Sequence, residues 1–336
     1  MKEHSVFFNE TLTYFYDMKK MLAAIVLTFL LNTTFAQSNS KSYSEVDNFV
    51  TKLGSLDSFN VAIIADTLTR SFPDKHAKAR AIFYWVANNI SFDLKAMKSN
   101  DNRKVDPVLV IKTRKATALG YANLIQEMSS MANIRCLTVD GYVKNFASEI
   151  NEPADEINHT WNVVQLGESP EQWFYVDAAK ASGYTDSRYT KFTKEFTSEY
   201  FFADKILFNL DHYPDNGAWQ LGPGPKKLKD FYSLPVFSNA AYVYGLQKST
   251  PAGGFIKAKT KNAVTFSFPH KNNIPISSIT LVTGEDKRQD KPLPMNFTSD
   301  GSNITFTHQF RKEDSYPVKI LVDGKVLVEY LAEVEE

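Results

Sequence analysis

The chain has 336 residues, and its 38 lysines and arginines balance 38 aspartates and glutamates, so the formal net charge is zero. A chain without excess positive charge is not expected to bind nucleic acid by neutralising phosphates. The length predicts about two domains, and 43% hydrophobic residues supply material for a large core. The single cysteine excludes an intramolecular disulfide framework and any cysteine-rich metal site.

The N-terminal region has the three-part anatomy of a secretory signal peptide. A short basic start at Met18–Lys20 precedes an apolar run from Met21 to Leu31, and small residues stand just before Gln37. The run is too short for a typical transmembrane helix, and the alternative interpretation is a buried N-terminal helix. We expect a signal peptide over residues 1–36, with Met18 as the true start. The mature chain is then secreted or periplasmic, with no stable membrane span.

Hydrophobic periodicity predicts a group of helices followed by a group of strands. The expected helices are Tyr43–Leu53, Val61–Arg70, Lys75–Asn89 and Ala118–Ala132, and the expected strands are Arg135–Val143, His159–Leu166 and Trp173–Ala178. Pro73 and Asp74 suit the start of the third helix. A polar loop is expected over residues 95–107. Helices followed by antiparallel strands predict an α+β domain.

Three sequence blocks in this region resemble the cysteine, histidine and aspartate blocks of the transglutaminase-like superfamily, relatives of the papain-type thiol enzymes. They are residues 112–124, 158–162 and 173–178. In that family the first block reads roughly Arg-Lys-Gly-Val-Cys-x-Gly-Tyr-Ala, which places the nucleophilic cysteine at Ala118. The helical stretch 83–93 also resembles the family's helix before that block. The resemblance implies a papain-like core.

The resemblance also implies a thiol site with three groups. A cysteine at a helix N-terminus has a lowered pKa, a histidine takes and returns the proton, and an aspartate orients the histidine ring. The chain supplies the second and third as His159 and Asp177, but the methyl group of Ala118 cannot attack a substrate. Ala116 and Leu119 also depart from the glycine and the acidic residue usual in the family. Several departures therefore cluster around one site.

Thr117 and Cys136 are the candidates for a replacement nucleophile. One residue along a helix turns a side chain by about 100°, which directs Thr117 away from His159, and a hydroxyl is far less acidic than a thiol. Cys136 lies in a predicted strand with the hydrophobic pattern of a buried core, and it is interpreted as a small buried hydrophobic residue. Tyr121 and Trp161 are expected to shape the floor of the cleft. The six histidines show no metal-ligand spacing, so we expect neither a metal nor another cofactor.

The sequence pattern changes twice in the rest of the chain. The elements Asp211–Pro214 and Trp219–Leu221 resemble the extension found after the core in transglutaminase-like proteins of the kyphoscoliosis-peptidase and cytokinesis type. Beyond Pro251 hydrophobic and polar residues alternate, and Asp323–Gly324 predicts a hairpin turn. The predicted parts are a core at 38–185, an extension at 186–250 and an all-β sandwich, immunoglobulin-like, at 251–336.

Two kinds of function are compatible with these features. The first is a secreted, catalytically inactive transglutaminase-like protein that binds or scaffolds a peptide or protein ligand of the cell envelope. The alternative is an active cysteine-type peptidase or protein-glutamine transamidase with a non-standard nucleophile. An engineered or sequencing-derived replacement of a cysteine at Ala118 is a further interpretation. The clustered departures favour relaxed constraint instead, and they predict that Ala118→Cys alone restores little or no activity.

Overall fold

The computed structural model describes residues 43–57, 60–99, 105–167, 169, 172–271, 274–284 and 289–336. The predicted signal peptide and Met18 lie outside the described residues. The chain divides between Tyr43 and Ser44 into two units, and all the elements below lie in the second, Ser44–Glu336. Among the described helices, none is both long enough and apolar enough to cross a membrane.

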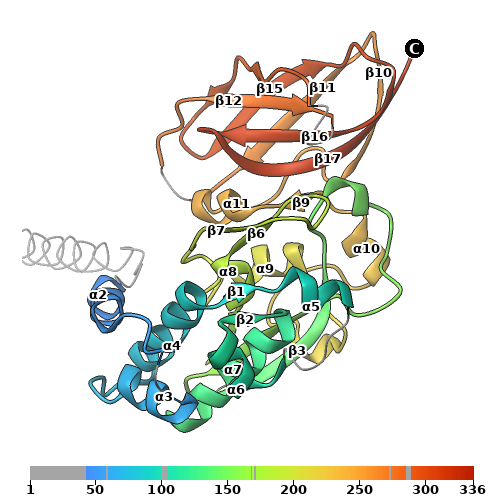
Figure 1. Cartoon of the computed structure of the whole chain (residues 1–336). Coiled ribbons are helices and arrows are strands. Elements are labelled where there is room, and N and C mark those ends of the chain that lie inside the picture. Colours follow the sequence, from blue (N-terminus) through green and yellow to red (C-terminus); the bar gives the residue numbers. More distant parts are fainter. Residues whose placement is uncertain are drawn as a thin grey trace, which may run out of the picture. The chain divides into compact units, whose positions relative to one another are not determined.

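The first part of this unit is mainly helical (Figure 1). Its helices are α2 (Ser44–Leu53), α3 (Val61–Thr69), α4 (Lys75–Asn89), α5 (Leu94–Ser99), α6 (Pro107–Thr113) and α7 (Ala118–Met131). Asn60, Asp74 and Asp106 each accept a hydrogen bond from an amide in the first turn of the helix that follows. Such caps satisfy donors that have no partner within the helix. The four predicted helices are confirmed to within one residue at each end.

The loop expected over residues 95–107 is partly wrong, because α5 occupies Leu94–Ser99. The carboxylate of Asp93 accepts a hydrogen bond from Ala96 N at 3.0 Å, and its carbonyl accepts one from Met97 N at 3.0 Å. A single capping residue thus starts a helix in a polar stretch. That stretch has no apolar periodicity by which the sequence could have indicated it.

A four-stranded antiparallel sheet with the order β5-β4-β3-β8 packs against α7. Its strands are β3 (Arg135–Val143), β4 (His159–Gln165), β5 (Trp173–Val176) and β8 (His212–Pro214). Residues 159–164 of β4 are all buried, so both faces of this central strand are covered. Helices followed by an antiparallel sheet confirm the α+β core. The strand β8 comes from the predicted extension.

Short elements connect this sheet to its surroundings. They are β1 (Ser91–Phe92), β2 (Lys115–Ala116), η3 (Ala147–Glu149), α8 (Ala178–Ser182), β6 (Gly183–Thr185), β7 (Phe192–Lys194), α9 (Lys205–Asp211), η5 (Gly217–Trp219), α10 (Leu228–Tyr232), β9 (Val236–Phe237) and α11 (Asn239–Tyr244). β1 and β2 form a parallel pair, and β6 and β7 form a hairpin. The predicted domain boundaries stay predictions.

The C-terminal strands, orange to red in Figure 1, form two sheets with the orders β10-β17-β16-β12-β13 and β11-β15-β14. They are β10 (Phe255–Lys259), β11 (Ala263–Pro269), β12 (Ile279–Thr283), β13 (Leu293–Pro294), β14 (Thr298–Ser299), β15 (Asn303–Gln309), β16 (Asp314–Val322) and β17 (Lys325–Glu335). The rings of Phe266 and Tyr330, from different sheets, lie 5.8 Å apart, so the sheets pack face to face. The predicted sandwich is confirmed, as is the turn at Asp323–Gly324, where both residues have positive φ. The immunoglobulin-like topology stays a prediction.

Candidate functional site

His159 and Asp177 lie side by side at one end of the core sheet. His159 begins β4, and Asp177 directly follows β5, the neighbouring antiparallel strand. His159 Nε2 lies 2.6 Å from Asp177 Oδ2, and the two residues are 8% and 1% exposed. The other carboxylate oxygen, Oδ1, caps α8 by accepting a hydrogen bond from Lys180 N at 2.9 Å. The short helix therefore holds the carboxylate in position for the imidazole.

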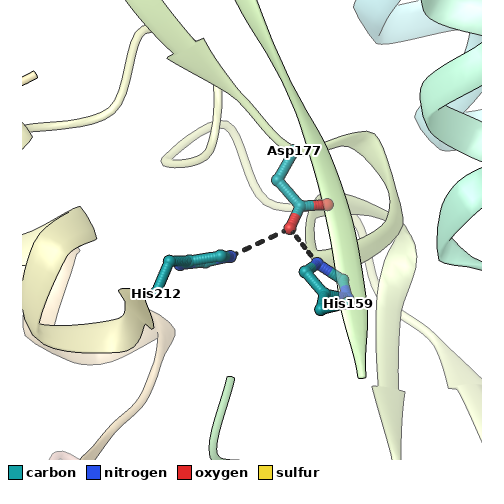
Figure 2. Close-up of side chains that lie close together, drawn as sticks. All are labelled: His159, Asp177 and His212. Carbon is teal, nitrogen blue, oxygen red and sulfur yellow. Dashed lines mark hydrogen bonds and ion pairs between the residues drawn. The ribbon is translucent and has the colours of Figure 1, made fainter. Parts of the chain in front are cut away.

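A second histidine, which was not predicted from the sequence as a site residue, joins this pair. His212 Nε2 lies 3.1 Å from the same Asp177 Oδ2, so this oxygen stands between two imidazoles (Figure 2). His212 begins β8, which pairs with β3, and its ring stacks on Phe208 with centroids 3.8 Å apart. The sequence signal for this histidine was the Asp-His pair within residues 211–214. That pair indicated the resemblance of the extension to related proteins, but not a role in the site.

Behind His212 lies another buried carboxylate. Asp211 Oδ2 accepts hydrogen bonds from Tyr200 Oη at 3.0 Å and Tyr242 Oη at 3.3 Å, and it lies 3.4 Å from His212 Nδ1. His212 Nδ1 has no partner at hydrogen-bonding geometry within the described part of the chain. The cluster thus contains two carboxylates and two imidazoles, all buried.

Electrostatics assign the protons in this cluster. Burial opposes ionisation of Asp177, but the charge and hydrogen bond of His159, with the hydrogen bond from His212, bring its pKa below its usual range. Burial also lowers the pKa of His212, against the opposing effects of Asp211 and Asp177. An ionised carboxylate can only accept, so both Nε2 atoms donate to Asp177. In His159 this leaves Nδ1 as the nitrogen that can act on a ligand.

His159, Asp177 and His212 place three possible metal-ligand atoms within 4.8 Å of one another. Two ligands of one tetrahedral zinc ion, each about 2.0–2.2 Å from it, lie roughly 3.3 Å or more apart. His159 Nε2 and Asp177 Oδ2 are 2.6 Å apart, too close for an ion to sit between them. The arrangement therefore fits a hydrogen-bonded cluster better than a metal centre.

Ala118 is the first residue of α7, and it lines the same cavity as His159. The cavity has a volume of about 1150 Å³, and its wall includes residues of the core, of the extension and of the C-terminal sandwich. Thr117 also lines the cavity. Its hydroxyl makes no hydrogen bond with His159, and none that caps α7, in the described structure. The cavity wall therefore combines the histidine of the His159–Asp177 pair with Ala118, whose methyl group is not a nucleophile.

Cys136 is remote from this site. It pairs with Val164 on β4, whereas Gly141 pairs with His159. Five residues of strand separate the two positions, or about 16 Å. Burial also raises the pKa of the Cys136 thiol to about 12, which disfavours the reactive thiolate. The interpretation of this cysteine as a small buried residue is confirmed by its 7% exposure.

Tyr121 and Trp161, expected at the floor of the cleft, are both 1% exposed and are not among the residues that line the cavity. Tyr121 Oη donates a hydrogen bond to Ile90 O at 2.6 Å. The ring of Trp161 lies nearly parallel to that of His159 at 6.3 Å and meets His212 edge-on at 5.1 Å. These two residues therefore act on the site through packing, and Trp161 supports both imidazoles.

Comparison with solved structures gives partial matches to two transglutaminases. Red sea bream transglutaminase aligns with 85% of this chain and 57% of its own, at 9% identity and a TM-score of 0.27. Another transglutaminase crystal structure aligns with 53% of this chain and 41% of its own, at 14% identity and a TM-score of 0.28.

Sequence comparison gives a more specific likeness. Kyphoscoliosis peptidase of Mus musculus is 31% identical over 196 residues, which cover 58% of this chain and 29% of that protein. Hillarin of Drosophila melanogaster is 25% identical over 182 residues, which cover 50% and 22%. This chain thus spans less than a third of the length of either relative. The model of the transglutaminase-like superfamily matches residues 62–178, the stretch that contains Ala118, His159 and Asp177. Residues 62–178 are therefore a transglutaminase-like domain.

Proposed function

We propose that this chain is a secreted transglutaminase-like protein without thiol catalysis that uses its cleft to bind a peptide or protein. The observation that carries the proposal is Ala118 at the N-terminus of α7, in the wall of the cavity that His159 also lines. The general acid–base pair is retained while the group that it would activate is absent. The signal peptide expected over residues 1–36 supports export, with a ligand in the cell envelope.

The large loss of kcat expected without a nucleophile supports the proposal of inactivity. In a serine hydrolase, loss of the nucleophile costs roughly a million-fold in kcat, and the residual rate comes from binding and oxyanion stabilisation. Cys136 cannot replace the missing group, because it is buried about 16 Å along the sheet from His159. A chain with these positions can hold a ligand in the cleft, but it has no thiol with which to open an amide bond.

A peptidase or transamidase with a non-standard nucleophile is the second candidate. The intact hydrogen bond between His159 and Asp177 favours it, because a purely structural site has no need of an oriented imidazole. Thr117 is the hydroxyl residue of the cavity wall next to Ala118. In this scheme His159 would deprotonate the Thr117 hydroxyl for attack on the carbonyl, and the proton would go to the leaving amine.

Turnover measurements separate the two candidates. Hydrolysis of a fluorogenic peptide library and incorporation of a labelled amine into casein are expected to stay at the level of the His159→Ala variant, because neither protein has a thiol at position 118. Ala118→Cys alone is expected to recover little or no turnover, since Ala116 and Leu119 also differ from the family pattern. Activity of the unmodified chain that disappears in both His159→Ala and Thr117→Val would establish the second candidate instead.

A further inference from the structure

One wall of the cavity is a β-hairpin whose base is fixed to the core. All of β6 lines the cavity, as do Asp186 and Tyr189 of the turn and Phe192 of β7. At the base, Glu195 N donates a hydrogen bond to Ser182 O at 3.1 Å. The ammonium group of Lys194 donates one to Ala87 O at 2.7 Å, near the end of α4. The two ends of the hairpin are therefore held in place independently of its turn.

The turn of this hairpin is shaped by its own hydrogen bonds. The side chain of Asp186 accepts a hydrogen bond from Lys191 N at 2.9 Å, and its carbonyl accepts one from Tyr189 N at 2.9 Å. Tyr189 has a φ of +53°, a left-handed conformation that is unfavourable for a bulky residue unless the surrounding structure holds it. The turn therefore holds Tyr189 in one backbone conformation at its tip.

Tyr189 connects this tip to the loop after β3. Its Oη accepts a hydrogen bond from Asn145 Nδ2 at 3.1 Å and donates one to Glu149 Oε1 at 3.4 Å, and its ring meets Phe146 edge-on with centroids 5.4 Å apart. Asn145 and Phe146 also line the cavity, so two of its walls meet at this contact. The neighbours of Tyr189 on both sides along the chain are exposed. Because little buried surface adds to these contacts, we expect the tip to open locally at a low cost in free energy.

The hairpin borders the part of the cavity that contains Ala118. β7 lies beside β1 (Figure 1), and the rings of Phe192 and Phe92 have centroids 6.2 Å apart. Phe92 pairs with Ala116, two residues before Ala118. Ala118 itself is 8% exposed. A displacement of the hairpin would therefore change the access of solutes to this position.

We propose that the hairpin β6–β7 is a lid on the cleft, that the contacts of Tyr189 with Asn145 and Glu149 hold it closed, and that a ligand reaches Ala118 when these contacts break. The inference goes beyond the proposed binding function, because it concerns access to the cavity and applies to any occupant. Two hydrogen bonds, one of them to a carboxylate, supply a small part of the stability of a domain. They can therefore break while the base of the hairpin and the rest of the core stay folded.

The probe is a thiol placed inside the lid, Ala118→Cys in the full chain, labelled with fluorescein-5-maleimide. The unmodified chain, in which Cys136 is the only cysteine, gives the background. Adding Tyr189→Phe to this reporter removes both hydrogen bonds but keeps the ring beside Phe146, and it is expected to speed labelling about tenfold. Tyr184→Phe is the matched control. It removes a hydroxyl from the same hairpin, at a residue 54% exposed, and should leave the labelling rate unchanged.

Trypsin gives a second measurement that needs no introduced thiol. It cleaves after Arg188 and Lys191, within the turn, when this segment opens. Tyr189→Phe alone is expected to be cut there about tenfold faster than the unmodified chain, and Tyr184→Phe at the same rate as the unmodified chain.

Equal labelling, or equal cleavage, of the Tyr189→Phe and Tyr184→Phe proteins would overturn the inference. Labelling of the introduced thiol no faster than that of Cys136 would also overturn it, because the cavity would then open only when the core unfolds. Neither measurement uses a ligand, so a failure of the lid stays distinguishable from a failure of the proposed function.

Discussion

Lys144 is a residue whose burial has an energetic cost. It is 2% exposed, its Nζ lies 3.7 Å from the centroid of the Phe231 ring, and it donates a hydrogen bond to Phe231 O at 2.5 Å. Burial lowers the pKa of Lys144 to about 7, although Asp211 and Glu149 oppose the shift. The unfolded chain keeps this lysine protonated up to about pH 10.4. Between these values the unfolded state binds more protons than the folded state, so stability rises with pH.

Replacing this lysine should remove that pH dependence. We expect the free energy of unfolding of the unmodified chain to rise between pH 7 and pH 9.5 with a slope of up to about 1.4 kcal/mol per pH unit from this group. Lys144→Met should lose this part of the slope and be more stable at pH 7 by about 1–3 kcal/mol, because no charge is buried. Urea denaturation at several pH values measures both, with Lys257→Met, at a side chain 78% exposed, as the control. An unchanged pH dependence of the free energy of unfolding in Lys144→Met would contradict a lowered pKa of Lys144 in the folded chain.

At the scale of the elements, the strand β3 makes close contacts with both of its neighbours, β4 and β8. A Cβ atom at Gly141 would lie 2.3 Å from Tyr213 O on β8 and 2.6 Å from the Trp161 ring on β4. Only glycine permits this close approach of three strands, although glycine alone weakens a strand. Gly141 also pairs with His159, the first residue of β4, and with Pro214, the last residue of β8, so the spacing of both strands depends on this position. The distance between His159 and His212 therefore depends on one missing side chain.

We expect Gly141→Ala to lower the free energy of unfolding by about 2–4 kcal/mol, because backbone and a buried indole must move to admit the methyl group. The displacement of β8 should also weaken the hydrogen bond from His212 to Asp177, seen as a change in the His212 ring resonances. Gly217→Ala is the matched control, since a Cβ there meets no atom within 4 Å. Equal stability of the two variants by urea denaturation would show that β3 tolerates the wider spacing.

In the molecule as a whole, the C-terminal sandwich shares a sheet with the extension and a hydrophobic cluster with the core. β9 of the extension pairs with β17, at Val328 with Phe237. Val236 packs with Ala147 and Ile150 of the core, and the sandwich residues Phe255 and Leu331 pack against them. The cavity likewise has residues from both parts in its wall. We therefore expect residues 44–336 to unfold cooperatively.

A charge in the shared cluster should uncouple the two parts. Val236→Asp in the full chain is expected to cost about 3–5 kcal/mol, because the carboxylate has no partner in an apolar cluster. All four tryptophans, Trp85, Trp161, Trp173 and Trp219, precede the sandwich, so their fluorescence follows the core, while circular dichroism follows both parts. The two signals should coincide in the unmodified chain and separate in Val236→Asp. Val108→Asp, at a position 65% exposed, is the control and should leave them coincident.

An element could be predicted from the sequence when residues close to one another along the chain determine it. The helix Lys75–Asn89 and the strand Arg135–Val143 were predicted with their observed bounds, because periodicity and capping act within a few residues. The helix α5 was missed, since a single side chain, Asp93, starts it. The strand β8 was missed because its three residues become a strand only by pairing with β3.

By itself the sequence determined the order of the three blocks and the alanine at position 118. An alanine at position 118 has no nucleophilic atom in any fold, so no tertiary contact can change that conclusion. The tertiary structure alone decided that His212 shares Asp177 with His159 and that Asp211 lies behind it. His212 is 35 residues from Asp177 along the chain, and long-range strand pairing brings the two together. No local pattern encodes such a contact, because it depends on the register of several strands at once.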